Sequence, residues 1–123
     1  MDSRHHPWLR WIVGGSRILL GVVLLLNPRF AARTWLGPDG ANPGVALLFR
    51  SIGARDVALG AGLLAAPPED TAWARAGTLA DVGDAGASLL NLRSVPARQV
   101  LPGAALAAVF AAAGAVLSVR AGR

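Results

Sequence analysis

The stretch WIVGGSRILLGVVLLL, residues 11–26, decides the fold that this sequence predicts. Extended back to about residue 8, it is an apolar segment close to the roughly 20 residues that an α-helix needs to cross the hydrocarbon core of a bilayer. Asn27-Pro28 follows it directly and is a helix stop. Arg17 interrupts the apolar run, which favours a helix packed within a bundle over a cleaved signal peptide.

Three further apolar segments follow along the chain, each about as long as the first. They cover about residues 44–66, 71–92 and 100–119. Pro102 falls in the first turn of the last segment, where proline is tolerated. Strands are not expected, because the runs do not alternate and single strands cannot span lipid with unpaired backbone groups. The sequence therefore predicts an all-α fold, in which residues 1–123 form one domain, a four-transmembrane-helix bundle.

The connections between these helices are short, and the longest, residues 27–43, carries the turn signal Gly37-Pro38-Asp39-Gly40. Four helices place both termini and the 67–71 loop on one side of the membrane. Because cytoplasmic segments carry an excess of basic residues, the arginines near the helix ends predict a multi-pass cell-membrane protein with cytoplasmic termini. Those on the terminal side are Arg4, Arg10, Arg75, Arg120 and Arg123, and those on the other side are Arg29, Arg33, Arg93 and Arg98.

The composition also favours lipid as the solvent of this chain. Hydrophobic residues make up 54% and charged residues 15%, where a soluble domain has about 25% charged residues. The net charge of +5 suits contact with membrane lipid that has anionic headgroups. The arginines are scattered among apolar runs and form no basic face, so nucleic acid is not an expected partner.

Several kinds of chemistry are not expected. The chain has no cysteine, which excludes disulfides and thiolate chemistry. His5-His6 lacks the further ligands that a metal site needs. No phosphate loop, nucleophile elbow or dinucleotide fingerprint is present, so no cofactor is expected.

Six charged residues fall within the four apolar segments, and as a set they are neutral. An unpaired charge costs about 2.5–3.5 kcal/mol at the centre of a bilayer, so six charges facing lipid are not expected. The side chains must face protein, water or one another. They are Arg17, Arg50, Arg55, Asp56, Asp81 and Asp84.

Glycines accompany these charges on the first two helices. Gly14 and Gly21 share one helix face with Arg17, and the second helix repeats this spacing in Gly53-x-x-Asp56-x-x-x-Gly60. Such glycines let a neighbouring helix approach closely. The second helix is polar on two sides, which predicts a central position or contact with a second protomer in a homo-oligomer.

The third helix has a polar seam, and the fourth has almost none. The seam follows the i, i+4, i+7, i+11, i+14 spacing of one helix face. Its members are Gly77, Asp81, Asp84, Ser88 and Asn91. The fourth segment is rich in alanine and is expected to serve as a packing or lipid-facing wall.

The pattern in the second helix, Arg50-x-x-Gly53-x-Arg55-Asp56-x-x-Leu59-Gly60, resembles the hallmark of a family of small four-helix membrane proteins described as a domain of unknown function. The first-helix pattern around Arg17 and the Asp81-x-x-Asp84 pair are similar too, so the resemblance covers nearly the whole chain. It implies a four-helix fold and a membrane location. It implies no particular reaction.

Three functions remain open from the sequence. The first is acid/base catalysis on an apolar small molecule, such as isomerisation, cyclisation or epoxide opening, in which two carboxylates transfer protons and an arginine holds the substrate or an oxyanion. The Asp-Arg-Asp set resembles that of limonene-type epoxide hydrolases in residue types only. The expected catalytic residues are Asp56, Asp81, Asp84, Arg17 and Arg50, and the expected substrate-binding residues are Arg55, Ser88 and Asn91.

The second function is that of a small proton-coupled transporter or channel, working as an oligomer. In length and helix number the chain resembles the small multidrug resistance transporters, although Arg17 stands near the place of their first-helix glutamate. The third function is that of a structural or accessory membrane subunit, in which the charges only pair helices and fix their register.

Overall fold

The computed structural model describes residues 7–121, so the His5-His6 pair, Arg4 and Arg123 lie outside the described residues. The described part is all-helical and has no strands, which confirms the all-α prediction. Its helices are α1 (Pro7–Leu26), α2 (Pro28–Leu36), α3 (Pro43–Ala65), α4 (Ala72–Leu90) and α5 (Ala97–Ala121), with two 3₁₀ turns, η1 (Gly37–Ala41) and η2 (Asn91–Arg93).

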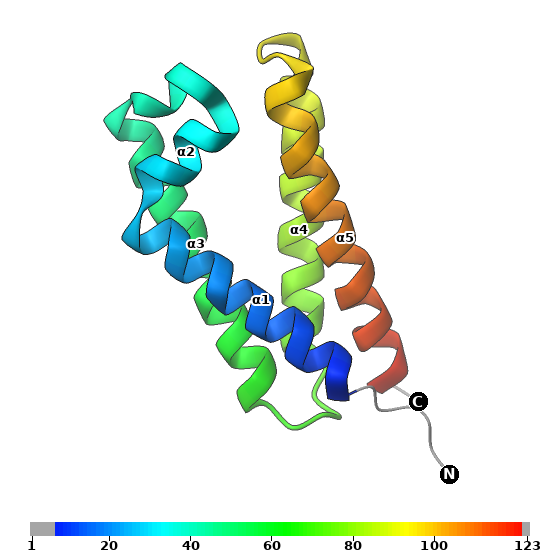
Figure 1. Ribbon diagram of the computed structural model, residues 1–123. Coiled ribbons are helices and arrows are strands. Elements are labelled where there is room, and N and C mark those ends of the chain that lie inside the picture. Colours follow the sequence, from blue (N-terminus) through cyan, green and yellow to red (C-terminus); the bar gives the residue numbers. More distant parts are fainter. Residues whose placement is uncertain (1–6, 122–123) are drawn as a thin grey trace.

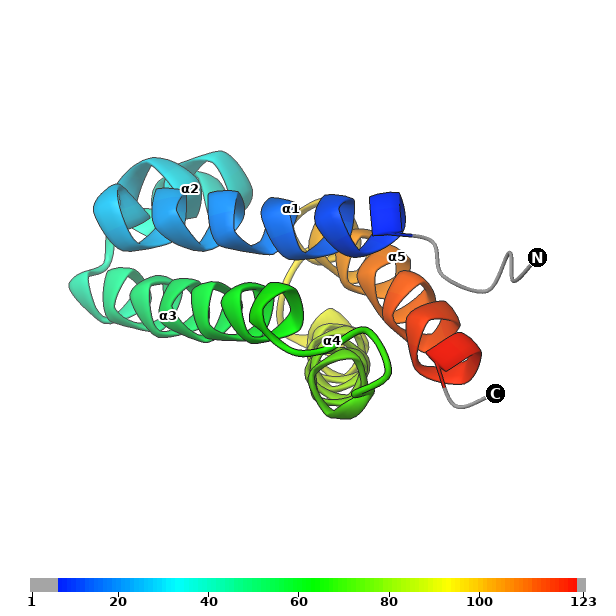
Figure 2. The ribbon, with the colours of Figure 1, turned by 90° about the horizontal axis from the view of Figure 1, so that it is seen from below.

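The four long helices form two antiparallel pairs (Figures 1 and 2). In one pair α1 lies along α3, and in the other α4 lies along α5. The contacts between the two pairs are fewer than those within each pair. Figure 1 shows α1 beginning and α5 ending at the same end of the molecule, opposite α2 and η2.

The glycines of α1 and α3 meet each other at the contact between the two helices. A Cβ atom added to Gly21 would lie 2.5 Å from the carbonyl oxygen of Gly53, and one added to Gly53 would lie 2.6 Å from that of Gly21. A Cβ atom on Gly60 would lie 2.5 Å from the carbonyl oxygen of Gly14. The two backbones therefore touch at two points along their length, which only glycine permits.

An arginine closes each end of the α1–α3 pair. Arg10 of α1 donates to the carbonyl oxygens of Leu63 and Ala66, the latter at 2.7 Å, where α3 ends. Arg50 of α3 donates through Nε to the carbonyl oxygen of Leu25 at 3.3 Å, where α1 ends. The last carbonyls of a helix have no partner within it, and these guanidinium groups supply one.

The segment expected as a loop contains a helix, α2, so that prediction was wrong. Asn27 ends α1 and also caps α2, because its side chain accepts a hydrogen bond from the backbone nitrogen of Phe30 at 3.3 Å while Pro28 takes the first helical position. Asn42-Pro43 starts α3 in the same way, with Gly44 as donor at 2.8 Å. An asparagine cap followed by proline is a helix start.

Helix α5 begins earlier than expected, at Ala97, so Pro102 lies inside the helix and not in its first turn. The start is fixed before the proline, since Gln99 and Val100 donate backbone hydrogen bonds to the carbonyl oxygen of Pro96. Proline has no N–H, and it therefore leaves one carbonyl of the first turn without its helical partner.

Two of the described helices are long and apolar enough to cross a membrane by length and composition: α1, and residues Ala97–Val119 of α5. Helices α3 and α4 each carry three charged residues, which lowers their apolar character.

Candidate functional site

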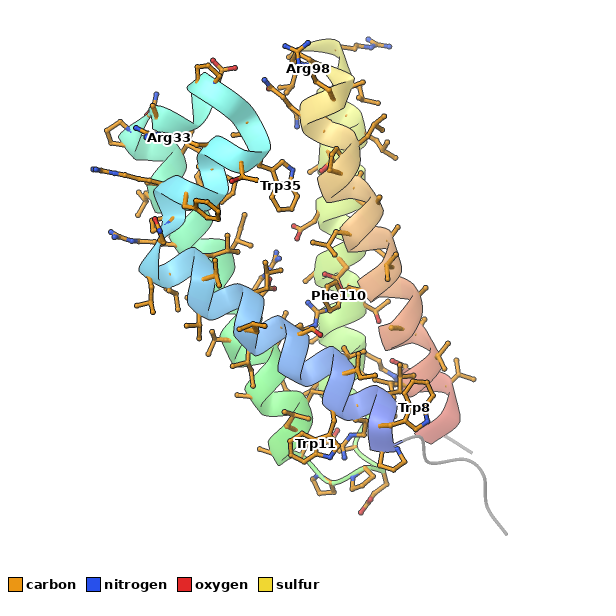
Figure 3. The ribbon with its side chains drawn as sticks, in the orientation of Figure 1. Trp8, Trp11, Arg33, Trp35, Arg98 and Phe110 are labelled. Carbon is orange, nitrogen blue, oxygen red and sulfur yellow. The ribbon has the colours of Figure 1, made fainter. Side chains whose placement is uncertain are left out.

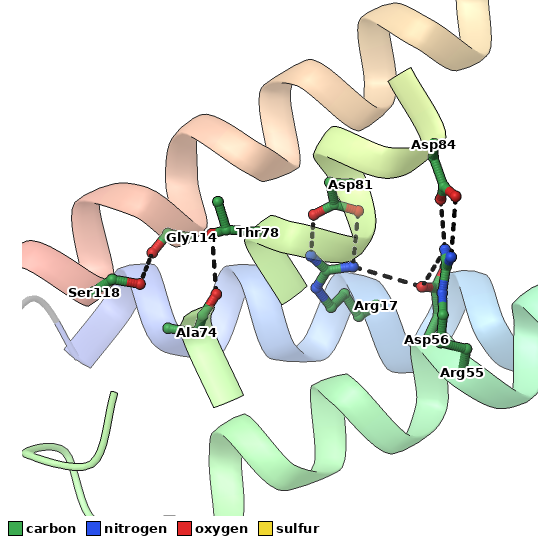
Figure 4. A network of polar contacts seen from close by, with 9 residues as sticks. All are labelled: Arg17, Arg55, Asp56, Ala74, Thr78, Asp81, Asp84, Gly114 and Ser118. Carbon is green, nitrogen blue, oxygen red and sulfur yellow. Dashed lines mark hydrogen bonds and ion pairs between the residues drawn. The ribbon is translucent and has the colours of Figure 1, made fainter. Parts of the chain in front are cut away.

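Charged side chains from α1, α3 and α4 meet where the two helix pairs face each other (Figure 4). At the centre is Arg17 of α1. Its guanidinium binds both carboxylate oxygens of Asp81 on α4, with Nη1 at 3.3 Å from Oδ1 and Nη2 bonded to Oδ2. Nη1 also lies 3.5 Å from Oδ1 of Asp56 on α3. One arginine therefore joins three helices.

A second arginine extends this arrangement. Arg55 of α3 donates to both carboxylate oxygens of Asp84 on α4, at 3.0 and 2.6 Å. Its Nη2 also lies 3.5 Å from Oδ1 of Asp56. Asp56 is thus shared by the two arginines and connects them. We call Arg17, Arg55, Asp56, Asp81 and Asp84 the ion network.

The glycines and an aromatic ring shape the surroundings of Arg17. A Cβ atom on Gly77 of α4 would lie 2.9 Å from Nη2 of Arg17, so the glycine leaves room for the guanidinium. The guanidinium of Arg17 lies over the ring of Phe110 on α5, with Cζ 5.0 Å from the ring centroid; Figure 3 labels Phe110. A cation over an aromatic face is attracted by the ring quadrupole. All four long helices therefore contribute to holding Arg17.

Burial divides the ion network into a closed part and an open part. Arg17, Asp56 and Asp81 are 3%, 4% and 4% exposed. The Arg55 and Asp84 side chains are 33% and 41% exposed. Nε of Arg55 is buried and has no hydrogen-bond partner among the described residues, although a guanidinium N–H is a strong donor. The open part lies at the Arg55–Asp84 pair.

Arg50, which the sequence predicts among the catalytic residues, does not belong to the ion network. Six residues separate Arg50 from Asp56 along α3, which at 3.6 residues per turn puts them about 120° apart around the helix. Arg50 is exposed and binds the end of α1 instead. Without Arg50, the ion network contains two guanidinium groups and three carboxyl groups.

Ser88 and Asn91, the C-terminal members of the polar seam on α4, also lie apart from the ion network. Ser88 donates to the carbonyl oxygen of Asp84 at 2.8 Å, and Asn91 donates to that of Ala87 at 2.7 Å. Both side chains are occupied by the backbone of their own helix, a common alternative for short polar side chains. The expected substrate-binding role of Ser88 and Asn91 stays a prediction.

Sequence reasoning missed two features: the contact of Phe110 with Arg17, and the contacts by which α2 connects the α1–α3 pair to α5. Phe110 is the one aromatic residue in the Ala-rich sequence of α5, and that isolation was the available signal. Trp35 of α2 points toward α5 (Figure 3), where its ring would lie 2.6 Å from a Cβ atom on Gly103. Gln99 of α5 donates to the carbonyl oxygen of Leu36 at 3.2 Å. These contacts join the helix pairs at the end opposite the chain termini.

The comparisons with known proteins bring no family to this chain. Neither the models of protein families, nor the curated proteins, nor the solved structures contain a match. The resemblance carried by the α3 pattern around Asp56 therefore stays a prediction, and the function is argued from the residues themselves.

Proposed function

We propose that this chain is an integral membrane protein in which all four long helices span the bilayer. Large apolar side chains are exposed on each of them: Leu19 is 68% exposed on α1, Leu47 66% on α3, Leu79 72% on α4 and Val109 66% on α5. Soluble monomers rarely expose contiguous apolar surface of this extent. The three most buried charged residues lie inside, so the polarity is inverted relative to a soluble protein.

Four of the six charged residues of α3 and α4 fit this proposal because they are paired within the ion network, while Arg50 and Arg75 are exposed. A charged residue within a membrane span faces the bundle interior and pairs with another charge. Arg55 of α3 binds Asp84 of α4, and the remaining carboxylates of these helices are bound by Arg17. The helices that are least apolar in composition thus present apolar side chains outward.

Within this membrane protein we propose an acid/base site that acts on an apolar small molecule. One observation carries this proposal: the ion network holds three carboxylates against two guanidinium groups. A net charge buried among apolar helices is unfavourable, and one bound proton makes the ion network neutral. We assign this proton to Asp56, because Asp81 and Asp84 each have both oxygens bound by one arginine.

Isomerisation fits such a site best among the reactions that two carboxyl groups perform. One carboxylate removes a proton from a carbon atom of the substrate, and a carboxylic acid returns a proton to another carbon, so no co-reactant is consumed. A substrate would reach the ion network at the half-exposed Arg55–Asp84 pair. There, the partly exposed guanidinium of Arg55 would stabilise an oxygen that gains charge during the reaction.

Infrared spectroscopy of the protein in bilayers tests the bound proton without knowledge of the substrate. A protonated carboxyl group has a C=O stretch that is separate from the carboxylate bands. We expect this band at neutral pH in the wild type and in the control Asp39→Asn, whose aspartate is exposed, and we expect its loss in Asp56→Asn. Absence of the band from the wild type would refute the acid/base proposal.

A structural role is the second candidate, and a different observation favours it. Every member of the ion network bonds another member, and together they connect the two helix pairs. Replacing a buried ion triad by apolar residues of similar volume is often neutral or stabilising. If the charges only pair helices, Arg17→Met with Asp56→Leu and Asp81→Leu should fold as well as the wild type in detergent and keep every activity of the protein.

A further inference from the structure

We propose that α2 lies in the membrane interface and that its exposed face binds the phosphate of an anionic phospholipid headgroup. This inference rests on the proposed membrane location and is independent of the acid/base site. It assigns a ligand to the end of the molecule opposite the chain termini, which the ion network does not reach.

Helix α2 has two faces of different character. Pro28, Ala31 and Ala32 are buried against the rest of the molecule. On the other face, Arg29 and Arg33 are exposed and lie one helical turn apart, at i and i+4. The basic face is therefore directed away from the protein, where it can meet anionic headgroups in the membrane interface.

The exposed face of α2 is held outward by contacts on its buried side. A Cβ atom on Gly40 would collide with the backbone of Ala32, so η1 packs directly on α2. The ring of Trp35 packs against Gly103 of α5. It also contacts the ring of Phe49 on α3 edge to face, with ring centroids 6.3 Å apart. Because α2 is held from behind at its middle by η1 and near its C-terminal end by Trp35, its two arginines keep a constant orientation toward the outside.

A surface depression of about 450 Å³ lies on this outer face. Its lining combines two guanidinium groups with the polar side chains of an asparagine and a threonine and with one aromatic ring. A phosphodiester needs cationic donors, and the acyl chains attached to it need apolar contact; Phe30, 62% exposed, supplies the latter. The lining residues are Asn27, Arg29, Phe30, Arg33 and Thr34.

No carboxylate competes for these arginines. The ion pairs of the described residues all belong to the ion network, and none includes Arg29 or Arg33. At the same end of the molecule, Arg98 is also exposed (Figure 3), as is Arg93 of η2. Asp39 is the one acidic residue at this end among the described residues. This end of the molecule is therefore basic, and two of its arginines, Arg29 and Arg33, line the depression.

The test compares two double variants that lose the same charge at the same end. Arg29→Gln with Arg33→Gln removes the arginines of the depression, and Arg93→Gln with Arg98→Gln removes two exposed arginines outside it. Full-length protein is reconstituted in bilayers of phosphatidylcholine containing phosphatidylglycerol, and the preference of the protein for spin-labelled phosphatidylglycerol over spin-labelled phosphatidylcholine is measured. We expect this preference to fall by roughly fivefold per arginine in the first variant and to change little in the second.

Three outcomes overturn the inference. If both variants lose the preference for phosphatidylglycerol to the same degree, the arginines attract anionic lipid through their charge in general, and the depression is not a specific site. A wild type without preference for phosphatidylglycerol means no headgroup site. Binding of inorganic phosphate to the detergent-solubilised protein, together with no lipid preference, means a soluble anion as ligand.

Extraction with alkaline carbonate separates this inference from the membrane proposal. Protein that resists extraction but shows no lipid preference overturns the headgroup site and leaves the membrane location intact. Protein that carbonate removes from the bilayers overturns both.

Discussion

Arg17 and Asp56 occupy equivalent positions in two antiparallel helices and face each other across the contact between them. Each is preceded by a glycine three residues before it and followed by one four residues after it. The glycine before Arg17 meets the glycine after Asp56, and the reverse pair meets as well. The guanidinium and the carboxylate are 3.5 Å apart. The α1–α3 pair is therefore nearly two-fold symmetric in its close contacts but carries a guanidinium on one helix and a carboxyl group on the other at its centre.

This arrangement explains why Arg17 and not another arginine organises the ion network. Glycines on both sides bring the α1 and α3 backbones together, so the side chain of Arg17 leaves the contact toward α4 and reaches Asp81. A like-charged residue at the position of Asp56 would repel it at this short distance. Although the glycine contacts of α1 and α3 are symmetric, Arg17 and Asp56 differ, and the ion network therefore extends from this contact toward α4.

Cysteine labelling should distinguish the lipid-facing surface from the surface in water. The chain has no native cysteine, so single cysteines report their own environment. In intact proteoliposomes, we expect a membrane-impermeant maleimide to label Arg33→Cys or Glu69→Cys, depending on orientation, and to leave Leu19→Cys, Leu79→Cys and Val109→Cys unlabelled. Labelling of these three at the rate of the loop cysteines, with the bilayer intact, would contradict the proposed spans.

Replacing Arg17 by lysine should destabilise the protein although the charge is kept. Lysine presents one compact ammonium group and cannot bind both oxygens of Asp81 while approaching Asp56. We expect a loss of about 1.5–3 kcal/mol in the free energy of unfolding, the typical contribution of a hydrogen bond to a charged group. Unfolding by sodium dodecyl sulfate, followed by circular dichroism, measures it. Arg98→Lys on exposed surface is the control, and an equal effect of both variants would argue against a special role of the guanidinium.

The parts of this structure that sequence reasoning predicted depend on local patterns. The apolar runs predicted the four long helices, and the glycine spacing around Arg17 and Asp56 predicted that a neighbouring helix approaches closely at these faces, without saying which helix. Helix α2 was missed because it is short and its polar face resembles a loop, although Asn27-Pro28 and Asn42-Pro43 are equivalent helix starts. Its packing depends on Trp35 meeting Gly103, a contact between distant segments that no local pattern encodes.

The charge balance of the ion network differs from the neutral set of six charges that the sequence predicts, for a related reason. The sequence predicts Arg50 within a membrane span together with the other five charges, but its side chain lies near the end of α1 and donates to the carbonyl oxygen of Leu25. Whether an arginine pairs with a carboxylate or caps a helix depends on where the neighbouring helix ends. That position follows from the antiparallel register of α1 and α3, which the sequence of α3 alone does not contain.

Two alanine substitutions on α1 should have opposite effects. Gly21→Ala places a methyl group 2.5 Å from a backbone oxygen of α3, so the helices must separate, and we expect destabilisation by about 1–3 kcal/mol. At Gly15 a Cβ atom meets nothing within 4 Å. Gly15→Ala therefore gains helix propensity, and we expect stabilisation by up to about 1 kcal/mol. Both are measured by thermal unfolding in detergent; destabilisation by Gly15→Ala to the same degree would show that the glycines act through flexibility and not through close contact.

Truncation of Trp35 should release α2 without disturbing the ion network. The ring fills the space over Gly103 and contacts Phe49, so Trp35→Ala leaves α2 tied to α5 mainly by the hydrogen bond from Gln99. We expect faster hydrogen exchange at the amides of residues 28–36 and unchanged exchange around Arg17, because stability is local where few contacts cross between elements. Trp11→Ala is the matched control, since Trp11 is 66% exposed. Faster exchange throughout α1 and α4 in Trp35→Ala would mean that the bridge formed by α2 holds the two helix pairs together, and that the ion network cannot do so alone.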